Sequence, residues 1–182
     1  EQDGVLKVRY AEVAFLTLPD LPAKKLTVQL PRAVAEHLTE VQLNSVSADF
    51  DVAALTVKNT LTFDSVSGDL ETDFLTADSA ELTTVSGKID LDGSFRQVTG
   101  GSTSGEVDLT LRKCPDRIEL NTVSGNVDLE LPRNAGFTLD YSTVSGDLES
   151  DFPLTAGGTC GDGSGSITID TTSGDLKIEN LD

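Results

Sequence analysis

Carboxylates recur along this chain at alternate positions that follow a repeated phrase. The phrase reads "TVSGNVDL" at residues 122–129, and acids occupy 16 of the 21 positions that lie one, three and five residues after the Gly or Ala of its seven copies. Rows of carboxylates bind cations, attract basic partners or, as isolated pairs, perform acid–base catalysis. We single out as a possible cation-binding acidic face the residues Asp69, Glu71, Asp90, Asp108, Asp128, Asp147 and Glu149.

The phrase returns with a period near 20 residues. Its central small residue is, in chain order, Ala48, Gly68, Gly87, Gly105, Gly125, Gly146 and Gly174. Such a period is typical of solenoids, in which one repeat alone cannot bury its apolar side. Apolar residues alternate on both sides of the phrase, as Ile118 and Leu120 do before Gly125, which predicts a strand on each side with one face inward. The alternation shifts by one residue across "VSG", which indicates a bend at the Gly.

We therefore expect an all-β, single-domain β-solenoid (β-helix) of about seven coils, wound right-handed. Residues 1–40 are expected to form N-terminal capping strands and the first irregular coils, and residues 41–182 the repeat solenoid, with a Gly-rich loop inserted at about 153–165. Ser before each Gly or Ala, with Ser or Thr two residues earlier, predicts hydroxyl ladders that bond between coils. The last residues, "KIENLD", are expected at the second open end of the solenoid, where a neighbouring segment or self-association covers the edge.

The net charge of −18 lies almost entirely in the repeats. Residues 1–40 hold five bases against six acids, whereas residues 41–182 hold eight bases against 25 acids. Such a surface repels nucleic acid and anionic lipid and attracts basic partners. No apolar run approaches the ~18 residues of a membrane span, so we expect a membrane to be reached only through an anchor that this chain lacks.

Two interpretations of the acidic rows stay open. In the first, a charged outer face keeps the protein soluble and prevents pairing with other sheets. In the second, the face binds Ca²⁺, a basic peptide or a basic polymer. The stretch "DGSGSITID" (162–170) begins like an EF-hand loop but lacks the later acids and the closing Glu. We therefore expect no cofactor and at most weak Ca²⁺ binding.

Other reactive residues are few. His37 has no second His to join it, and Cys114 and Cys160 lack the spacing of metal ligands, although a disulfide and two free thiols both remain open. A catalytic Ser occurs once and needs a base beside it. The Ser of this phrase recurs in every copy, which indicates a structural role. No carboxylate pair stands out as an acid–base couple, so we expect no enzyme activity and place a polysaccharide-acting β-helix enzyme last.

The pattern "[ST]-x-S-G-[DN]-[LV]-x-[LV]" over residues 41–182, with "LPRAVAEHLTEVQLNSVSADFDV" at 30–52, resembles a family of bacterial cell-envelope proteins labelled adhesins, a β-helical domain of unknown function. The resemblance implies an extracytoplasmic domain at the surface of a bacterium, membrane-anchored in the full-length protein, and it transfers no catalytic residue.

These observations together predict a non-catalytic surface module, an adhesin or an envelope-stress scaffold. Its flat faces would bind a protein, a cationic peptide or a cell-envelope polymer. The alternative is a structural protein that assembles end to end through the solenoid ends.

Overall fold

The computed structural model describes residues 5–8, 27–35 and 37–181, and almost all of its regular structure is β. The one helix among these residues is α1 (Arg32–Ala35). The strands are β1 (Val5–Val8), β2 (Glu40–Asn44), β3 (Phe50–Val52), β4 (Thr60–Asp64), β5 (Leu70–Thr84), β6 (Ile89–Ser102), β7 (Val107–Leu111), β8 (Arg117–Thr122), β9 (Val127–Pro132), β10 (Phe137–Ser142), β11 (Leu148–Ser150), β12 (Thr159–Cys160), β13 (Gly165–Asp170) and β14 (Leu176–Leu181).

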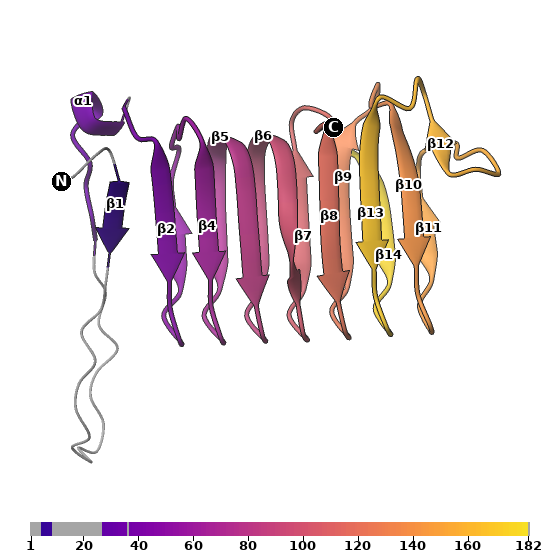
Figure 1. Ribbon diagram of the computed structural model, residues 1–182, viewed down its shortest axis with the longest axis horizontal. Helices are drawn as coiled ribbons and strands as arrows, with labels where there is room; N and C mark the ends of the chain where they lie inside the picture. The colour runs from indigo at the N-terminus through magenta and orange to yellow at the C-terminus, as the bar shows by residue number, and fades with distance from the viewer. Residues whose placement is uncertain (1–4, 9–26, 36, 182) are drawn as a thin grey trace, which may run out of the picture.

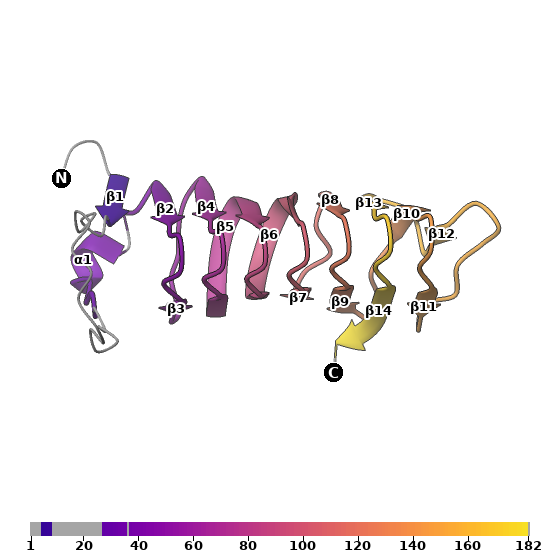
Figure 2. The ribbon, with the colours of Figure 1, turned by 90° about the horizontal axis from the view of Figure 1, so that it is seen from below.

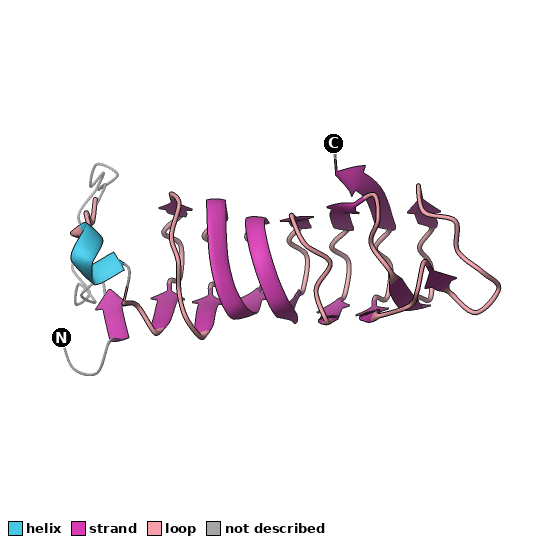
Figure 3. Ribbon diagram, turned by 90° about the horizontal axis from the view of Figure 1, so that it is seen from above, coloured by secondary structure: helices cyan, strands magenta, loops and turns pink. Residues whose placement is uncertain are grey.

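The strands form a curled, mostly parallel sheet that folds into two facing rows, a solenoid-like arrangement (Figure 3). We call each copy of the phrase with its two strands a repeat, numbered 1 to 7 in chain order. The strand before the bend lies in the first row and the strand after it in the second row. Strands β5 and β6 are long because each runs on from the second row of one repeat into the first row of the next. The prediction of an all-β, solenoid-like fold is confirmed.

The last repeat lies between repeats 5 and 6 rather than at the end of the rod. In the first row β13 pairs with β8 and β10, and in the second row β14 pairs with β9 and β11. Both views show these strands enclosed by their neighbours, and the chain ends away from the tip (Figures 1 and 2). The expectation that "KIENLD" forms an open end is therefore wrong. The segment 151–164 allows this order, because it leaves repeat 6 and returns as β12 along the outer edge of β10.

The core lies between the two rows and consists of the alternating apolar residues on either side of the phrase. Ile118, Leu120, Val127 and Leu129 of repeat 5 are all buried, as the alternation predicts. In repeat 6, at the tip of the rod, Leu148 is 42% exposed, whereas its counterparts in repeats 2 to 5 and 7 are buried. Burial of such a side chain contributes about 1.5–3 kcal/mol, so stacked neighbours supply most of the stability of each repeat.

The bends stack so closely that a side chain does not fit at the Gly. A Cβ on any of the six glycines would lie under 3.0 Å from the carbonyl oxygen of the same position in the neighbouring bend. The order of these contacts runs from Ala48 through Gly68, Gly87, Gly105, Gly125 and Gly174 to Gly146. Ala48 begins the series, and among the described bends none lies on the side toward which its methyl group points.

The hydroxyl ladders differ from the prediction in their partners. The Ser before the Gly does bond between repeats, but to a backbone carbonyl, as Ser86 Oγ does to Val66 O (3.2 Å). The hydroxyl two residues earlier mostly stays within its own bend and accepts the Gly amide, as Ser102 Oγ does from Gly105 (2.7 Å). The hydroxyls thus satisfy backbone groups that the bend would otherwise leave unpaired.

Candidate cation-binding face

Residues three positions after each Gly or Ala form one straight row on the outer face of the second row of strands, which we call the outer row. The ladder places its members as Cα partners in the order Asp51, Glu71, Asp90, Asp108, Asp128, Lys177, Glu149. Five carboxylates are therefore stacked at the ~4.8 Å spacing of neighbouring strands. The insertion of repeat 7 places Lys177 between Asp128 and Glu149 in this row, and the Lys177 ammonium forms an ion pair with Glu179 (2.9 Å) on the same strand.

Residues one position after each Gly or Ala form a second row, the bend row, and it has a structural task. The Asp49 carboxylate accepts the amide of Asp69 (3.0 Å), and the Asp69 carboxylate accepts the amide of Lys88 (2.7 Å). At the other end, the Asn126 side chain accepts the amide of Asp175 (3.1 Å) and Asp175 accepts that of Asp147 (2.9 Å). These side chains cap the amide that follows each bend.

Lys88 neutralises the centre of the acidic face. Its ammonium bonds to the Asp108 carboxylate and lies 3.4 Å from Glu106 Oε2. The hydrogen bond to Asp108 is the main reason why the pKa of Lys88 is raised well above its usual range. This lysine is therefore charged at all physiological pH values.

Arg112 lies at one border of the acidic face and contacts both an acid and an aromatic ring. Its guanidinium binds both oxygens of the Asp92 carboxylate (2.8 and 2.7 Å) and covers the Phe74 ring, 4.2 Å from the ring centre. Phe74 is 58% exposed and has a positive φ of 54° at an irregularity in the pairing of β5 with β6. The pair Asp92–Arg112 thus holds an exposed aromatic ring in a strained backbone position.

Two carboxylates of the outer row are harder to ionise than ordinary aspartates. Partial burial raises the pKa of Asp90, and the neighbouring Asp108 charge adds to this. Burial likewise raises the pKa of Asp128, again with Asp108 as the first charge that adds to it. Like charges in direct register are destabilising in a sheet, and repulsion by Asp108 is the second cause of both shifts, after burial.

Glu106, Asp108 and Asp128 are the one group of three acids in the described residues whose ligand atoms lie within 4.8 Å of one another. Asp108 Oδ1 is shielded from solvent and has no hydrogen-bond partner among the described residues. A Ca²⁺ ion takes six to eight oxygens, and the Lys88 ammonium already bonds to two of these acids. The donor set therefore fits a weak site at best, in which a metal would compete with Lys88.

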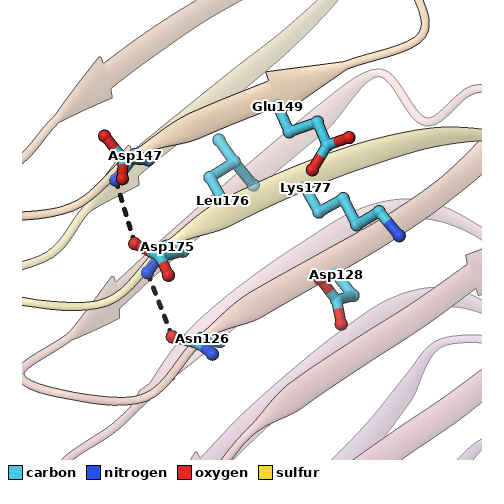
Figure 4. A pocket seen from close by; sticks show the side chains of 7 residues that line it. All are labelled: Asn126, Asp128, Asp147, Glu149, Asp175, Leu176 and Lys177. Atoms are coloured by element: carbon cyan, nitrogen blue, oxygen red, sulfur yellow. Dashed lines mark hydrogen bonds between the residues drawn. The ribbon is translucent and has the colours of Figure 1, made fainter.

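A shallow hollow of about 340 Å³ lies where repeat 7 is inserted. Figure 4 shows its rim, with the bend-row chain Asn126–Asp175–Asp147 on one side and Lys177 between Asp128 and Glu149 on the other. The hollow is open and its lining is mostly charged, so it does not enclose a reacting molecule.

The thiols are not arranged for nucleophilic chemistry. Both cysteines are free. Cys114 Sγ lies 3.5 Å from the Gly136 carbonyl oxygen, and burial raises the pKa of this thiol, which disfavours the reactive thiolate. His37 is exposed.

The predicted site residues therefore fall into two groups. Glu71, Asp90, Asp108, Asp128 and Glu149 lie in the outer row, with Glu149 cut off from the rest by Lys177. Asp69 and Asp147 lie in the bend row. The Asp69 carboxylate caps the Lys88 amide, whereas Asp147 donates its own amide to the Asp175 carboxylate. Glu106 was not in the predicted set although it joins the acidic group at Lys88. The recurrence of Asp or Asn directly after five of the seven central residues was the signal that could have identified the caps.

Comparison with known families agrees with this architecture. The model of the Toastrack DUF4097 family matches residues 17–179. The chain belongs to the Toastrack DUF4097 family. Toastrack domains are β-rich and of unknown function, so membership supports the fold and assigns no activity or adhesin role. No curated protein and no solved structure matches this Toastrack chain. No helix in the described part of it is long and apolar enough to cross a membrane.

Proposed function

We propose that this chain is a non-catalytic binding module at the surface of a bacterial cell, where it holds a basic partner against its outer row. Adhesion and envelope-stress scaffolding are the two roles that such a module serves. Its rod would contain about seven coils with a right-handed winding. The observation that carries the proposal is the uninterrupted register of Asp51, Glu71, Asp90, Asp108 and Asp128.

The electrostatic cost of placing carboxylates in direct register supports a role in binding. A face designed only for solubility can alternate acids with bases, as the chain does where Lys177 separates Asp128 from Glu149. Burial is the main cause of the raised pKa of Asp90 and Asp128, and the charge of Asp108 in the same row adds a like-charge cost. A basic partner that lies along the row relieves that cost.

A basic polypeptide or polymer fits this face better than a small ion. The row extends about 19 Å over four strand spacings, which a single ion cannot span. Among the described residues, one group of three acids converges, and Lys88 already bonds to two of them. The partner is therefore a chain with several positive charges rather than a resident metal.

End-to-end assembly is the second candidate, because the outer edge of β11 leaves Leu148 exposed at the tip of the rod. Two features restrict it. Strand β12 covers the neighbouring edge of β10 at Phe137 and Thr138, and β1 covers β2 at the opposite end. At the tip, the outer edge of β11 therefore has no strand partner among the described residues, whereas the edge of β10 is covered in part.

The test is binding of fluorescently labelled decalysine, measured by anisotropy at low and at physiological salt. The decisive variant combines Glu71→Gln, Asp90→Asn, Asp108→Asn and Asp128→Asn. A matched control removes four charges from the exposed face of the first row: Asp64→Asn, Glu81→Gln, Asp140→Asn and Asp170→Asn. We expect saturable binding at physiological salt that the outer-row variant weakens at least tenfold and the control leaves within twofold. Equal weakening by both variants, or no binding at physiological salt, would show that the face serves solubility only.

A further inference from the structure

The tips of the bends carry a ridge of five valines and two threonines. In six of the seven bends, the residue two positions before the Gly or Ala has its carbonyl bonded to the next bend, as Val46 O accepts the Ser67 amide and Val66 O accepts the Ser86 amide. These bonds place the residues of the ridge in the spatial order Val46, Val66, Val85, Thr103, Val123, Thr172, Val144. The bends follow one long edge of the rod (Figure 1).

The ridge holds most of the large apolar side chains that are exposed in the described part of the chain. Among the described residues eight large hydrophobic side chains are exposed, and five of them are the valines of the ridge. Val66, Val85 and Val123 are 46%, 45% and 50% exposed, whereas Val46 and Val144, at the two ends, reach 70% and 84%. Exposed apolar surface collected in one line marks an interaction site more often than scattered side chains do.

Acids line one side of the ridge and occupy two positions on the other side. The bend row lies three residues further along the chain and carries exposed acids such as Asp49, Asp69 and Glu106. On the other border, two residues before the ridge, lie the exposed Asp64 and Asp170. A second copy of this chain, itself charged −18, is repelled by such borders. The complementary partner has an apolar stripe with bases on each side.

The spacing of the ridge selects the conformation of that partner. Neighbouring bends are ~4.8 Å apart, close to the 5.4 Å pitch of an α-helix. An extended strand presents side chains on one face only every ~6.7 Å. Its side chains would therefore lose register with the bends within two repeats. The seven positions extend about 29 Å over six strand spacings, which matches a helix of ~20 residues.

We propose that the ridge docks an amphipathic, basic α-helix of a partner protein, with the helix axis along the rod. The apolar stripe of the helix packs on Val66, Val85 and Val123, and its lysines or arginines reach the acids on either border. This inference rests on the proposed function, since it names the kind of basic partner and the surface beside the outer row that completes its site.

Two synthetic probes separate the apolar from the electrostatic part. The first is a 20-residue Leu/Lys peptide with its leucines on one helical face, and the second is oligolysine with the same number of lysines. The decisive variant is Val66→Thr/Val85→Thr/Val123→Thr. Threonine already occupies the equivalent positions 103 and 172, so the bends tolerate it. Val28→Thr, at an equally exposed valine outside the ridge, is the control.

At physiological salt we expect the Leu/Lys peptide to bind wild-type protein at least tenfold more tightly than oligolysine and to gain helical circular dichroism. The triple variant should lose about tenfold in affinity for the Leu/Lys peptide, with oligolysine binding and the Val28→Thr control unchanged within twofold. Unchanged Leu/Lys affinity in the triple variant, or an equal loss for both probes, would overturn the docking site. Ridge-dependent Leu/Lys binding without any oligolysine binding would support the ridge and contradict the proposed outer-row function.

Discussion

Neighbouring bends can approach one another closely because Gly has no Cβ atom. Each Gly of the phrase lies against the carbonyl oxygen of the bend beside it, with no room for a Cβ. Ala48 is the one copy with a side chain, and it begins the series. The change from Ala to Gly therefore marks the repeat at which the regular stack starts.

Replacing an interior Gly should be far more harmful than restoring one at the first bend. We expect Gly105→Ala to destabilise the protein by about 3 kcal/mol, because its Cβ would overlap backbone that cannot move without separating two repeats. Ala48→Gly should lower the free energy of unfolding by less than about 1 kcal/mol, since it only increases the conformational entropy of the unfolded chain. Urea unfolding of both variants measures the difference. Equal costs would mean that the bends are not in close contact.

Phe74 offers a second comparison at the residue scale. Its positive φ costs about 1–2 kcal/mol for a residue with a Cβ, and its stacking with Arg112 returns about 0.5–1 kcal/mol at an exposed site. Phe74→Ala loses the stacking and keeps the strain, whereas Phe74→Gly loses both. We expect the Gly variant to be more stable than the Ala variant by about 1 kcal/mol in thermal unfolding. The reverse order would contradict the strained backbone.

At the scale of elements, the unexpected feature is the position of repeat 7 between repeats 5 and 6. Gly165 explains it in part, because a Cβ there would lie 2.7 Å from the Pro115 carbonyl oxygen and 3.3 Å from Cys114 Sγ. The matching residue of repeat 6 is Phe137, which would not fit beside Pro115. Lys177 adds a charge argument, since it separates Asp128 from Glu149.

Removal of repeat 7 should therefore disorder repeat 6 as well. In a chain that ends at residue 164, β11 has lost its described strand partner β14, and β10 keeps only the short β12. We expect amide hydrogen exchange over residues 137–150 to become fast, while residues 60–130 stay protected. Protection retained over 137–150 would show that repeat 6 can dock directly on repeat 5.

The strands and the bends could be predicted because their signals are local. Alternation with period two identified inward residues such as Ile118 and Val127, and the recurring Gly identified the bend. The order of the last two repeats could not be predicted, because all repeats share the same offsets and any two would pair in the same register. The choice depends on contacts between residues far apart in sequence, such as Gly165 with Pro115.

The candidate site was predictable to a similar degree. Alternation showed that Asp90, Asp108 and Asp128 share a face, and the ladder places them in direct register. Alternation alone could not show that the Asp69 side chain bonds to a backbone amide, nor that Lys177 interrupts the row. Both facts depend on which repeat follows which in space.

At the scale of the whole molecule, the excess of acid makes stability depend on pH. The folded protein raises the pKa of Asp90 and Asp128, so it binds protons more readily than the unfolded chain. The stability from such groups is fully present below their unfolded pKa and is lost as pH rises through the folded pKa. The pKa of exposed Asp162, which Ser164 lowers, has the opposite sign but acts only at more acidic pH.

We therefore expect the Tm to rise as the pH is lowered from 7 toward about 4.5, near the ordinary aspartate range. Asp90→Asn/Asp128→Asn should raise the Tm at pH 7 and flatten the profile, and Asp64→Asn/Asp170→Asn, at exposed acids outside the outer row, is the control. Calorimetry from pH 4.5 to 8 measures both. A Tm that falls over this acidification would contradict the raised pKa of these partly buried, mutually repelling carboxylates.

The buried position of the last repeat also sets the mechanical response of the rod. A force applied at the C-terminus acts on β14, which is bonded on both sides, by β9 and β11. The strand is loaded in shear, and its release frees the tip of the rod at the same moment. In optical tweezers we expect the first rupture to lengthen the chain by about 160 Å, for ~45 residues of extended backbone. A rod whose repeats were stacked in chain order would instead unwind in steps of about 70 Å, one repeat at a time.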